Sequence, residues 1–195
     1  MTQNQLHVVV LAGPNGAGKS TTAPALLQGQ LGVAEFVNAD TLARGLSAFS
    51  PEGAAIEAGR IMLRRLQQLA AQQRDFAFET TLASRTFAPR ITEWMQTGSA
   101  IHLLFLWLPT PAFALARVQE RVRVGGHDVP AATVRRRYRR GLVNFFALYQ
   151  PLVTTWRFYD NSGTRPRLIA QGKKRGRGRI IDRSLRTRIT EAYDG

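Results

Sequence analysis

A glycine-rich motif near the start of the chain constrains its fold more than any other feature. Residues 13–21 read GPNGAGKST and fit the pattern G-x-x-x-x-G-K-[ST], which is known as the P-loop. The apolar run LHVVVLAG at 6–13 predicts a buried strand before the motif, and residues 18–28 predict a helix after it. A strand, a glycine-rich turn and a helix in this order form the context that a phosphate-binding loop requires.

The residue types of the motif indicate that it binds a nucleoside triphosphate together with Mg²⁺. Glycines let backbone N–H groups approach phosphate oxygens, and the N-terminus of the following helix carries partial positive charge. We expect Lys19 to contact the outer phosphates and the Ser20 hydroxyl to coordinate Mg²⁺. The expected ATP-binding residues of the loop are Gly13, Pro14, Asn15, Gly16, Ala17, Gly18, Lys19, Ser20 and Thr21.

Short apolar runs alternate with longer amphipathic segments along the rest of the chain. Further strands are predicted at 34–40, 76–80, 100–108, 157–160 and 167–170, and further helices at 52–73, 86–97, 112–124, 131–149 and 182–193. The alternation predicts an α/β fold, a P-loop NTPase three-layer sandwich with a mainly parallel central sheet and a helical lid. No linker or repeat divides the chain, so we expect one domain over residues 1–195, with the lid at about 112–145.

The composition excludes several classes of protein. Hydrophobic residues make up 44% of the chain and charged residues 21%, as in a globular domain rather than a disordered one. The absence of cysteine excludes disulfides, iron–sulfur clusters and thiolate chemistry, and three histidines leave little for a histidine-based metal site. No apolar run reaches the length of about 18 residues that a membrane span needs. The polar start MTQNQ has no features of a secretory signal, so we expect a cytoplasmic protein without a membrane partner.

The net charge of +14 is distributed unevenly along the chain. Residues 1–110 hold eight Lys/Arg and seven Asp/Glu, whereas residues 111–195 hold nineteen Lys/Arg and six Asp/Glu. The second half should therefore attract polyanions or phosphorylated small molecules. Within it, the segment GKKRGRGR at 172–179 has five basic residues, and we interpret it as a solvated loop rather than as a specific binding element.

Two acidic residues stand at the ends of predicted strands and are candidates for chemistry. Asp40 ends FVNAD and Glu79 is near the end of FAFET, at the edge where ligands gather in open α/β sheets. A carboxylate at such a place can accept a proton from a substrate hydroxyl or hold Mg²⁺. The alternatives are that Asp40 is only a helix N-cap and that Glu79 is only a surface residue.

Five segments follow one another along the chain: AGPNGAGKST, FVNAD, FETTL, GGHDVP followed by RRRYRRG, and YDNS. As an ordered set, which runs from residue 12 to about 162, they resemble the zeta toxin family of P-loop kinases. The resemblance implies an ATP-dependent kinase that phosphorylates a hydroxyl of a UDP-activated amino sugar, UDP-N-acetylglucosamine. It also implies a separate antitoxin that blocks the ATP site. Since the first predicted strand begins at residue 6, we expect no antitoxin domain fused in front of it.

The resemblance implies a role for each matching residue. Asp40 corresponds to the base that acts on the acceptor hydroxyl, and Glu79 to the acidic residue that holds the acceptor. Asn161 and Ser162 belong to the loop near the adenine. The implied catalytic residues are Asp40, Lys19, Arg121 and Arg117, and the implied metal ligands are Ser20 and Asp40. The implied substrate-binding residues are Glu79, Thr80, Thr81, Arg85, Arg123 and His127.

The lid is where the sequence departs from the resemblance. An arginine there would stabilise charge on the transferring phosphoryl group. Arg117 and Arg121 are four residues apart and face the same way on a helix, so we rank the lid candidates as Arg121, Arg117 and then Arg123. The alternative for each is a solvated helix charge. Larger zeta toxins have a second arginine just before a lid proline, and His127 takes that place here.

Two other functions stay open from the sequence alone. Within the kinase class, the acceptor could be another small metabolite or an antibiotic such as chloramphenicol. The basic second half would also suit a nucleotide-dependent nucleic-acid-binding protein. Against this second function, the sequence has neither a helix-turn-helix signature nor a basic strand with interleaved aromatic residues.

Overall fold

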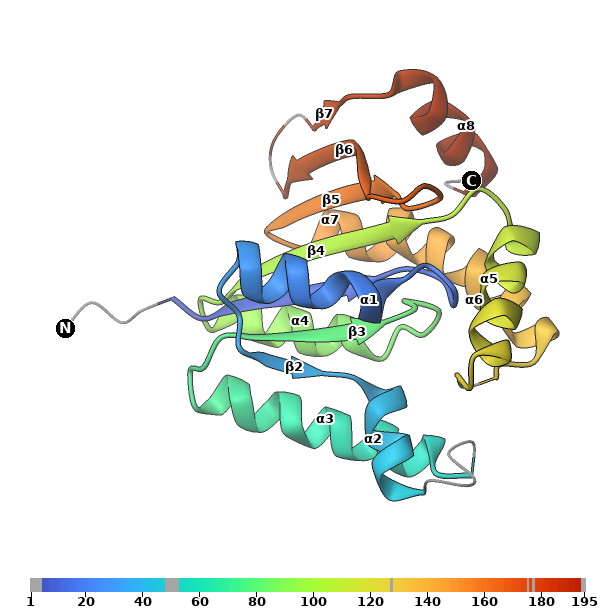
Figure 1. Cartoon of the computed structure of the whole chain (residues 1–195). Coiled ribbons are helices and arrows are strands. Elements are labelled where there is room, and N and C mark those ends of the chain that lie inside the picture. The colour runs from blue at the N-terminus through green and yellow to red at the C-terminus, as the bar shows by residue number, and fades with distance from the viewer. Residues whose placement is uncertain (1–4, 48–52, 127, 175, 177, 194–195) are drawn as a thin grey trace.

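Figure 1 shows the fold, a computed structural model in which one central sheet has helices on both of its faces. The structure describes residues 5–47, 53–126, 128–174, 176 and 178–193. The strands are β1 (His7–Ala12), β2 (Glu35–Val37), β3 (Phe76–Thr80), β4 (Ala100–Trp107), β5 (Thr155–Asp160), β6 (Arg167–Lys173) and β7 (Arg179–Ile180). The helices are α1 (Lys19–Ala23), η1 (Pro24–Gln30), α2 (Ala39–Leu46), α3 (Ala55–Ala71), α4 (Phe87–Gln96), α5 (Pro111–Arg123), α6 (Ala131–Asn144), η2 (Phe145–Tyr149), α7 (Gln150–Leu152) and α8 (Arg183–Tyr193).

The strand order is β2-β3-β1-β4-β5-β6-β7. The first five strands in this order pair in parallel, and β6 and β7 are antiparallel to their neighbours. The predicted α/β fold of a P-loop NTPase with a mainly parallel sheet is therefore confirmed. All five parallel strands end at one edge, which we call the carboxyl edge, and α5 and α6 lie at this edge (Figure 1). The P-loop follows β1 there, Asn38 follows β2, Glu79 lies near the end of β3, and Asn161 follows β5.

Several element boundaries differ from the prediction. The strand predicted at 34–40 ends at Val37, because helix α2 begins at Ala39. The helix predicted at 131–149 divides into α6 and the wider π-type turn η2. The segment 172–179 is only partly a loop, since β6 extends to Lys173 and β7 begins at Arg179. Over the described parts of the chain, no helix has the length and apolar character needed to cross a membrane.

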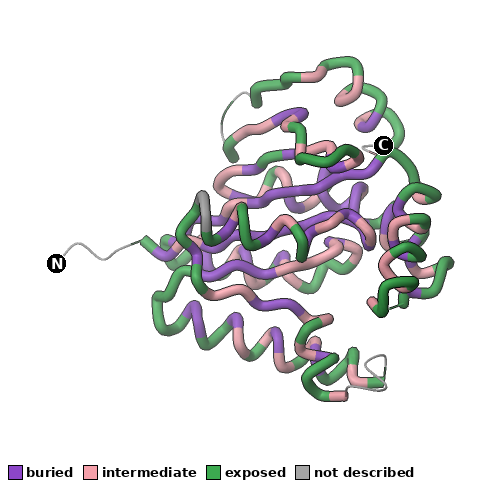
Figure 2. The backbone as a smooth tube through the Cα atoms, viewed as in Figure 1, coloured by how far each residue is buried: buried purple, intermediate pink, exposed green. Residues whose placement is uncertain are grey.

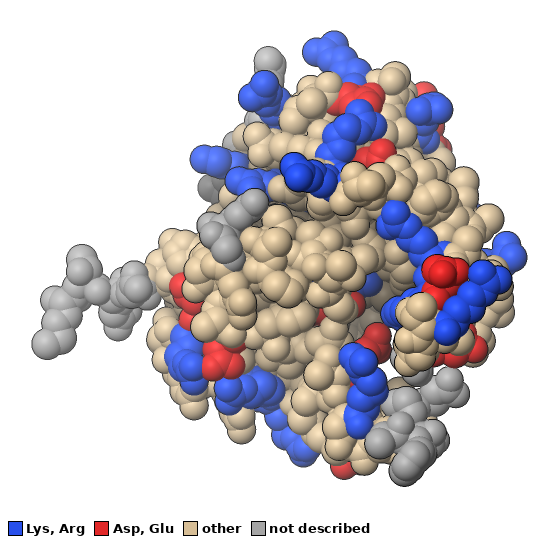
Figure 3. Space-filling model, in the orientation of Figure 1, with Lys and Arg blue, Asp and Glu red and all other residues tan. Residues whose placement is uncertain are grey.

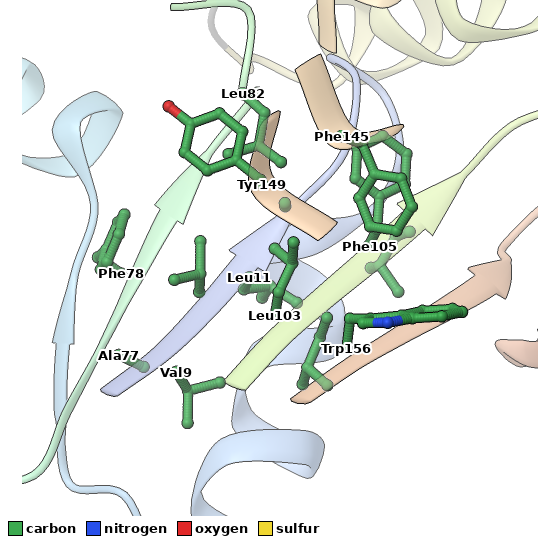
Figure 4. Close-up of a cluster of buried hydrophobic side chains, with 14 of the residues drawn as sticks. Val9, Leu11, Ala77, Phe78, Leu82, Leu103, Phe105, Phe145, Tyr149 and Trp156 are labelled. Carbon is green, nitrogen blue, oxygen red and sulfur yellow. The ribbon is translucent and has the colours of Figure 1, made fainter. Parts of the chain in front are cut away.

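Buried aromatic side chains join the sheet to the helices of the second half (Figure 4). Phe145 of η2 packs against both Phe105 of β4 and Phe158 of β5, with ring centroids 4.8 Å and 5.0 Å away, and all three side chains are fully buried. Figure 2 shows that buried positions concentrate in the strands and on the sides of the helices that face them. Because large aromatic contacts dominate core energetics, this cluster holds α6 and η2 firmly against the sheet.

Candidate active site

The loop between β1 and α1 has a backbone that its glycines permit. Gly13 and Gly16 have φ values of 145° and 79°, which side-chain-bearing residues rarely adopt. A Cβ atom on Gly13 would lie 2.3 Å from the carbonyl oxygen of Leu106, and one on Gly16 would lie 2.5 Å from that of Ala114. The glycines therefore let the loop pack closely against the end of β4 and against α5, in addition to leaving room for phosphates.

Lys19, the first residue of α1, points back into the loop. Its Nζ donates to the carbonyl oxygens of Gly13 at 2.9 Å and Pro14 at 3.0 Å, and lies 3.5 Å from Oε1 of Glu79. Burial lowers the pKa of Lys19, while the negative charges of Glu79 and Asp40 oppose that shift. The loop thus holds a buried amine at the place where the motif predicts contact with the outer phosphates.

Three polar side chains form a hydrogen-bonded group beside Lys19. Ser20 Oγ donates to Glu79 Oε2 at 2.7 Å, and Asn38 Nδ2 donates to the same oxygen at 2.8 Å. The structure therefore places Glu79 against Ser20, one of the expected metal ligands. The group brings together Glu79 near the end of β3 and two residues that follow β1 and β2, because β3 lies between β2 and β1 in the sheet.

Asn38 is a site residue that the sequence analysis missed. Its Oδ1 accepts a hydrogen bond from the backbone N–H of Asp40 at 2.8 Å and thereby caps α2. The alternative that Asp40 is the N-cap is wrong, because Asn38 holds that position and Asp40 lies in the first turn. The available signal was an asparagine directly before a helical segment, since asparagine is a preferred N-cap residue.

Two cavities adjoin at this group of residues. The P-loop cavity, of about 660 Å³, lies between the P-loop, α5 and the segment 161–166. The β3 cavity, of about 460 Å³, lies between the segment after β3, α3 and α6. Asn15, Lys19, Asp40 and Glu79 line both cavities. Two molecules bound in these cavities would therefore face each other across a lysine and two carboxylates.

The loop after β5 is tied to both the P-loop and α5. Asn161 is buried, and its Nδ2 donates to the carbonyl oxygen of Ala17 at 2.7 Å. The guanidinium of Arg117 donates to the carbonyl oxygens of Asn161 at 2.8 Å and Ser162 at 2.9 Å. Asn161 and Arg117 line the P-loop cavity, whereas Ser162 does not. The expected contact of Asn161 and Ser162 with adenine stays a prediction.

The other predicted basic site residues divide into two groups. Arg121 lines the P-loop cavity, as the lid interpretation requires. Arg123 instead forms an exposed ion pair with Glu120 at 3.1 Å and lines neither cavity, and Arg85 also lines neither. His127 lies outside the described residues.

The β3 cavity combines hydroxyl groups with positive charge. Thr80 and Thr81 line it, and their role in substrate binding stays a prediction. Arg136, Arg137 and Arg140 of α6 line it as well. The sequence analysis did not single out these three, because the segment RRRYRRG holds five arginines and the pattern alone does not show which of them face the sheet.

Helix α6 is fixed against the turn that carries the two threonines. A Cβ on Gly141 would lie 2.4 Å from the carbonyl oxygen of Thr81, so the helix backbone touches the turn. Asn144 Nδ2 donates to the carbonyl oxygen of Leu82 at 2.7 Å. Leu82 is fully buried and has a φ of 54°, a conformation that costs about 1–3 kcal/mol when a side chain is present. The contacts with α6 therefore hold this strained turn in place.

These residues fit a nucleoside triphosphate and Mg²⁺. Asn15 Oδ1 is a buried acceptor for which no described group supplies a hydrogen bond. The Ser20 hydroxyl and the carboxylates of Glu79 and Asp40 are the hard oxygen donors that Mg²⁺ prefers. No three His, Cys, Asp or Glu residues in the described ranges cluster closely enough to hold a metal alone. An Mg²⁺ ion bound here would therefore take its remaining ligands from phosphates and water.

Comparison with known sequences assigns the chain to a family. Residues 8–142 match the sequence profile of AAA_33, a family described as an AAA domain. The chain belongs to the AAA_33 family. Its matched region contains the P-loop, Asp40, Glu79 and most of the predicted lid. An uncharacterized protein of Haemophilus influenzae is 28% identical to this AAA_33 chain over 134 residues, which are 69% of this chain and 94% of that protein.

Solved structures share the fold of this AAA_33 chain. A chain of the AvrRxo1-ORF1:-ORF2 complex with ATP has a TM-score of 0.74 and 19% identity, and the match covers 95% of this chain and 64% of that chain. A chain of the PezAT chromosomal toxin–antitoxin system of Streptococcus pneumoniae has a TM-score of 0.69 and 14% identity, with 94% of this chain and 77% of that chain covered. The AAA_33 chain thus spans less than two thirds of its AvrRxo1 relative, and at these identities the likeness is one of fold.

Proposed function

We propose that this chain is an ATP-dependent phosphotransferase that transfers the γ-phosphoryl group of ATP to a hydroxyl of a UDP-activated amino sugar, such as UDP-N-acetylglucosamine. The observation that carries the proposal is the wall that the P-loop cavity and the β3 cavity share. Phosphoryl transfer depends on positioning two molecules in line and on stabilising charge between them. ATP in the P-loop cavity and the acceptor in the β3 cavity would meet at Lys19, Asp40 and Glu79.

The residues of the P-loop cavity have defined tasks in this proposal. Lys19 exchanges its bonds to the carbonyl oxygens of Gly13 and Pro14 for bonds to phosphate oxygens. Ser20 and Glu79, which are hydrogen-bonded to each other, would hold Mg²⁺, and the ion when bound neutralises charge on the phosphates. In this proposal Glu79 replaces Asp40 as the carboxylate ligand that the resemblance implies, and it no longer has the implied role of holding the acceptor. Arg121 approaches the transferring phosphoryl group from α5.

Asp40 is the proposed base for the acceptor hydroxyl. The hydroxyl proton passes to the Asp40 carboxylate as the hydroxyl oxygen bonds to the γ-phosphorus, and the bond from this phosphorus to the β–γ bridging oxygen breaks to release ADP. The cap that Asn38 forms fixes the backbone of Asp40, so the carboxylate is positioned where the two cavities meet. A base placed in this way contributes about 10²- to 10⁴-fold to a rate.

The lining of the β3 cavity supports an acceptor that carries phosphate groups. Arg136, Arg137 and Arg140 can bind the diphosphate of a sugar nucleotide, because guanidinium groups match phosphate oxygens in geometry and charge. The hydroxyls of Thr80 and Thr81 can bond to the sugar. A metabolite without phosphate would leave the three arginines unused.

A separate antitoxin is part of the same proposal. The Streptococcus pneumoniae relative is described as a toxin–antitoxin system, and the AvrRxo1 relative is a complex of two proteins. We infer that a second protein of this kind covers the ATP site of this chain in the cytoplasm. Nucleic acid has no role in the proposed reaction.

The proposal is tested by measuring ATP consumption with Mg²⁺, without acceptor, with each member of a panel of UDP-sugars, and with hydroxyl-bearing metabolites that lack UDP. We expect turnover that depends on UDP-N-acetylglucosamine, that is lost in Asp40→Asn and that is retained in Glu57→Gln, a matched change at an exposed acid of α3. Turnover with another hydroxyl-bearing metabolite alone would keep the phosphotransferase and reject the acceptor. ATP binding without turnover on any acceptor would reject the phosphotransferase.

A further inference from the structure

A third cavity lies at the opposite edge of the sheet from the P-loop. It is formed at the amino ends of β1, β4 and β5 and at the carboxyl end of the antiparallel strand β6, and has a volume of about 690 Å³. Strand β1 runs from His7, which lines this cavity, to Ala12 before the P-loop, and six strand residues span roughly 20 Å. We call it the amino-edge cavity. It shares none of its described lining residues with the P-loop cavity or the β3 cavity.

Three exposed basic side chains converge on the amino-edge cavity from three strands. They are Arg157 of β5, Lys173 of β6 and Arg179 of β7, and none of them forms an ion pair with a described carboxylate. Asp75, the single acidic residue among the described lining residues, accepts a hydrogen bond from the backbone N–H of His7 at 2.7 Å. Figure 3 shows further Lys and Arg side chains over β6, β7 and α8. The excess of unneutralised positive charge favours an anionic ligand.

Apolar side chains form the floor of the amino-edge cavity. Val9, Leu104 and Trp156 line it and are each almost completely buried. A Cβ on Gly172 would lie 2.7 Å from the ring of Trp156, so this glycine lets β6 lie directly on the indole. Gly172 and Gly178 therefore pack against the Trp156 ring, and Lys173 and Arg179 line the rim, so these residues of the basic segment do more than extend into solvent. An apolar floor beside a basic rim suits a ligand that has both an apolar body and an anionic group.

The histidines of the cavity do not favour a metal ligand. His7 Nδ1 and His102 Nε2 are 3.0 Å apart, and His102 Nδ1 is 2.8 Å from Thr155 Oγ1. Both nitrogens of His102 therefore have protein partners. No three His, Cys, Asp or Glu side chains among the residues that the structure describes lie close enough together to hold a metal ion. An anion, rather than a cation, is the ligand that the lining supports.

We propose that the amino-edge cavity binds a phosphorylated small molecule with an apolar or aromatic body, at the same time as the P-loop holds ATP. The phosphate contacts Arg157, Lys173 and Arg179, and the body rests on Val9 and Leu104. The cavity volume lies within the range of about 300–1,000 Å³ that is typical of ligand sites. A nucleic-acid strand would use the same cations but would have no use for the apolar floor, so the small molecule is the better fit.

The test is an NMR titration of the full chain with phenyl phosphate, which has a phosphate group and an aromatic body. Mg²⁺ and a saturating ATP analogue that cannot be hydrolysed keep the P-loop occupied. We expect saturable changes in the amide shifts of Val9, His102, Thr155 and Gln171. Pyrophosphate, which lacks the apolar body, is expected to bind more weakly at the same amides.

Two double variants decide whether binding is specific to the cavity. Arg157→Ala with Lys173→Ala should weaken phenyl phosphate binding at least about tenfold, because each lost contact is a charge-assisted hydrogen bond. Arg60→Ala with Arg135→Ala removes the same charge from exposed positions on α3 and α6, and should change the affinity less than about twofold.

Four results would overturn the proposal. They are no shift change at the amino edge, a change confined to the P-loop, equal loss of binding in both double variants, and binding of a single-stranded oligonucleotide without any response to phenyl phosphate. The last result would assign the basic rim to nucleic acid. None of these outcomes depends on phosphoryl transfer, since the titration follows a cavity that the proposed reaction does not use.

Discussion

Replacing Asn38 tests whether one side chain fixes the positions of both Asp40, the proposed base, and Glu79, the proposed metal ligand. Asn38 is 8% exposed, caps α2 through Oδ1, and donates through Nδ2 to Glu79. Asn38→Ala removes the cap, which costs about 1 kcal/mol. It also removes a hydrogen bond to a charged group, which costs about 1.5–3 kcal/mol. The free energy of unfolding should therefore fall by about 2.5–4 kcal/mol, equivalent to a loss of roughly 5–16 °C in Tm for a chain of this length.

Two further variants separate the contributions of Asn38. Asn38→Ser and Asn38→Asp both keep an N-cap acceptor, but only the aspartate places a second negative charge against Glu79. We expect Asn38→Asp to be the less stable of the two in urea unfolding followed by circular dichroism, and to have the lower ATP turnover. If Asn38→Asp proves as stable as the unaltered chain, the bond to Glu79 contributes nothing and the reasoning is refuted.

Three other predictions concern the base, the P-loop and the histidine pair. Asp40→Asn should lower kcat at least about 100-fold and change the Kd for ATP less than about twofold, and an unaltered kcat would remove Asp40 as base. Gly16→Ala should cost more than about 1 kcal/mol in urea unfolding, because its Cβ would lie 2.5 Å from a carbonyl oxygen at a φ of 79°. Gly163→Ala, where a Cβ meets no atom within 4 Å, should be nearly neutral, and equal costs would contradict this account. Burial, with help from the charge of His7, lowers the pKa of His102 below 6.5 in the folded chain. As the pH falls, His102 is therefore protonated in the unfolded chain before it is protonated in the folded chain. Stability should therefore decline as the pH drops from about 6.5 through the folded-state pKa, and urea unfolding over a pH series should show a weaker decline in His102→Gln.

The first half of the fold was predictable because independent signals agree there. The apolar run of β1, the glycines of the P-loop and the helical pattern after it all specify one arrangement. The edge formed by β6 and β7 was less predictable. Strand β7 has only two residues and lies in a glycine-rich basic segment, so no alternation marks it. Its neighbour β6 packs on Trp156 through Gly172, a tertiary contact that local pattern does not reveal.

The candidate site was predictable in its residue types but not in its contacts. Lys19, Ser20, Asp40 and Glu79 follow from the motif and from their positions at strand ends. The bond between Glu79 and Ser20 depends on the strand order, because β3 must lie next to β1 for Glu79 to reach the start of α1. The strand order depends on how the whole sheet packs, and a local sequence pattern does not show it. The same reason explains why Asn38 was missed. It follows β2, and its amide donates to Glu79 in the neighbouring strand β3.

The polar groups of the site are arranged so that bound phosphates would replace protein partners with little loss of hydrogen bonding. Lys19 is bonded to two loop carbonyls and lies beside Glu79, and Glu79 accepts from Ser20 and Asn38. A buried polar group costs free energy mainly when it has no partner, so these contacts stabilise the loop, and phosphates and Mg²⁺ can take over from them. Asn15 Oδ1 is the contrast, because it is buried without a described partner at the wall that the two cavities share. An unsatisfied acceptor at that position is costly for the fold alone, and an acceptor hydroxyl or a metal-bound water, rather than an ionised phosphate, would supply the donor it lacks.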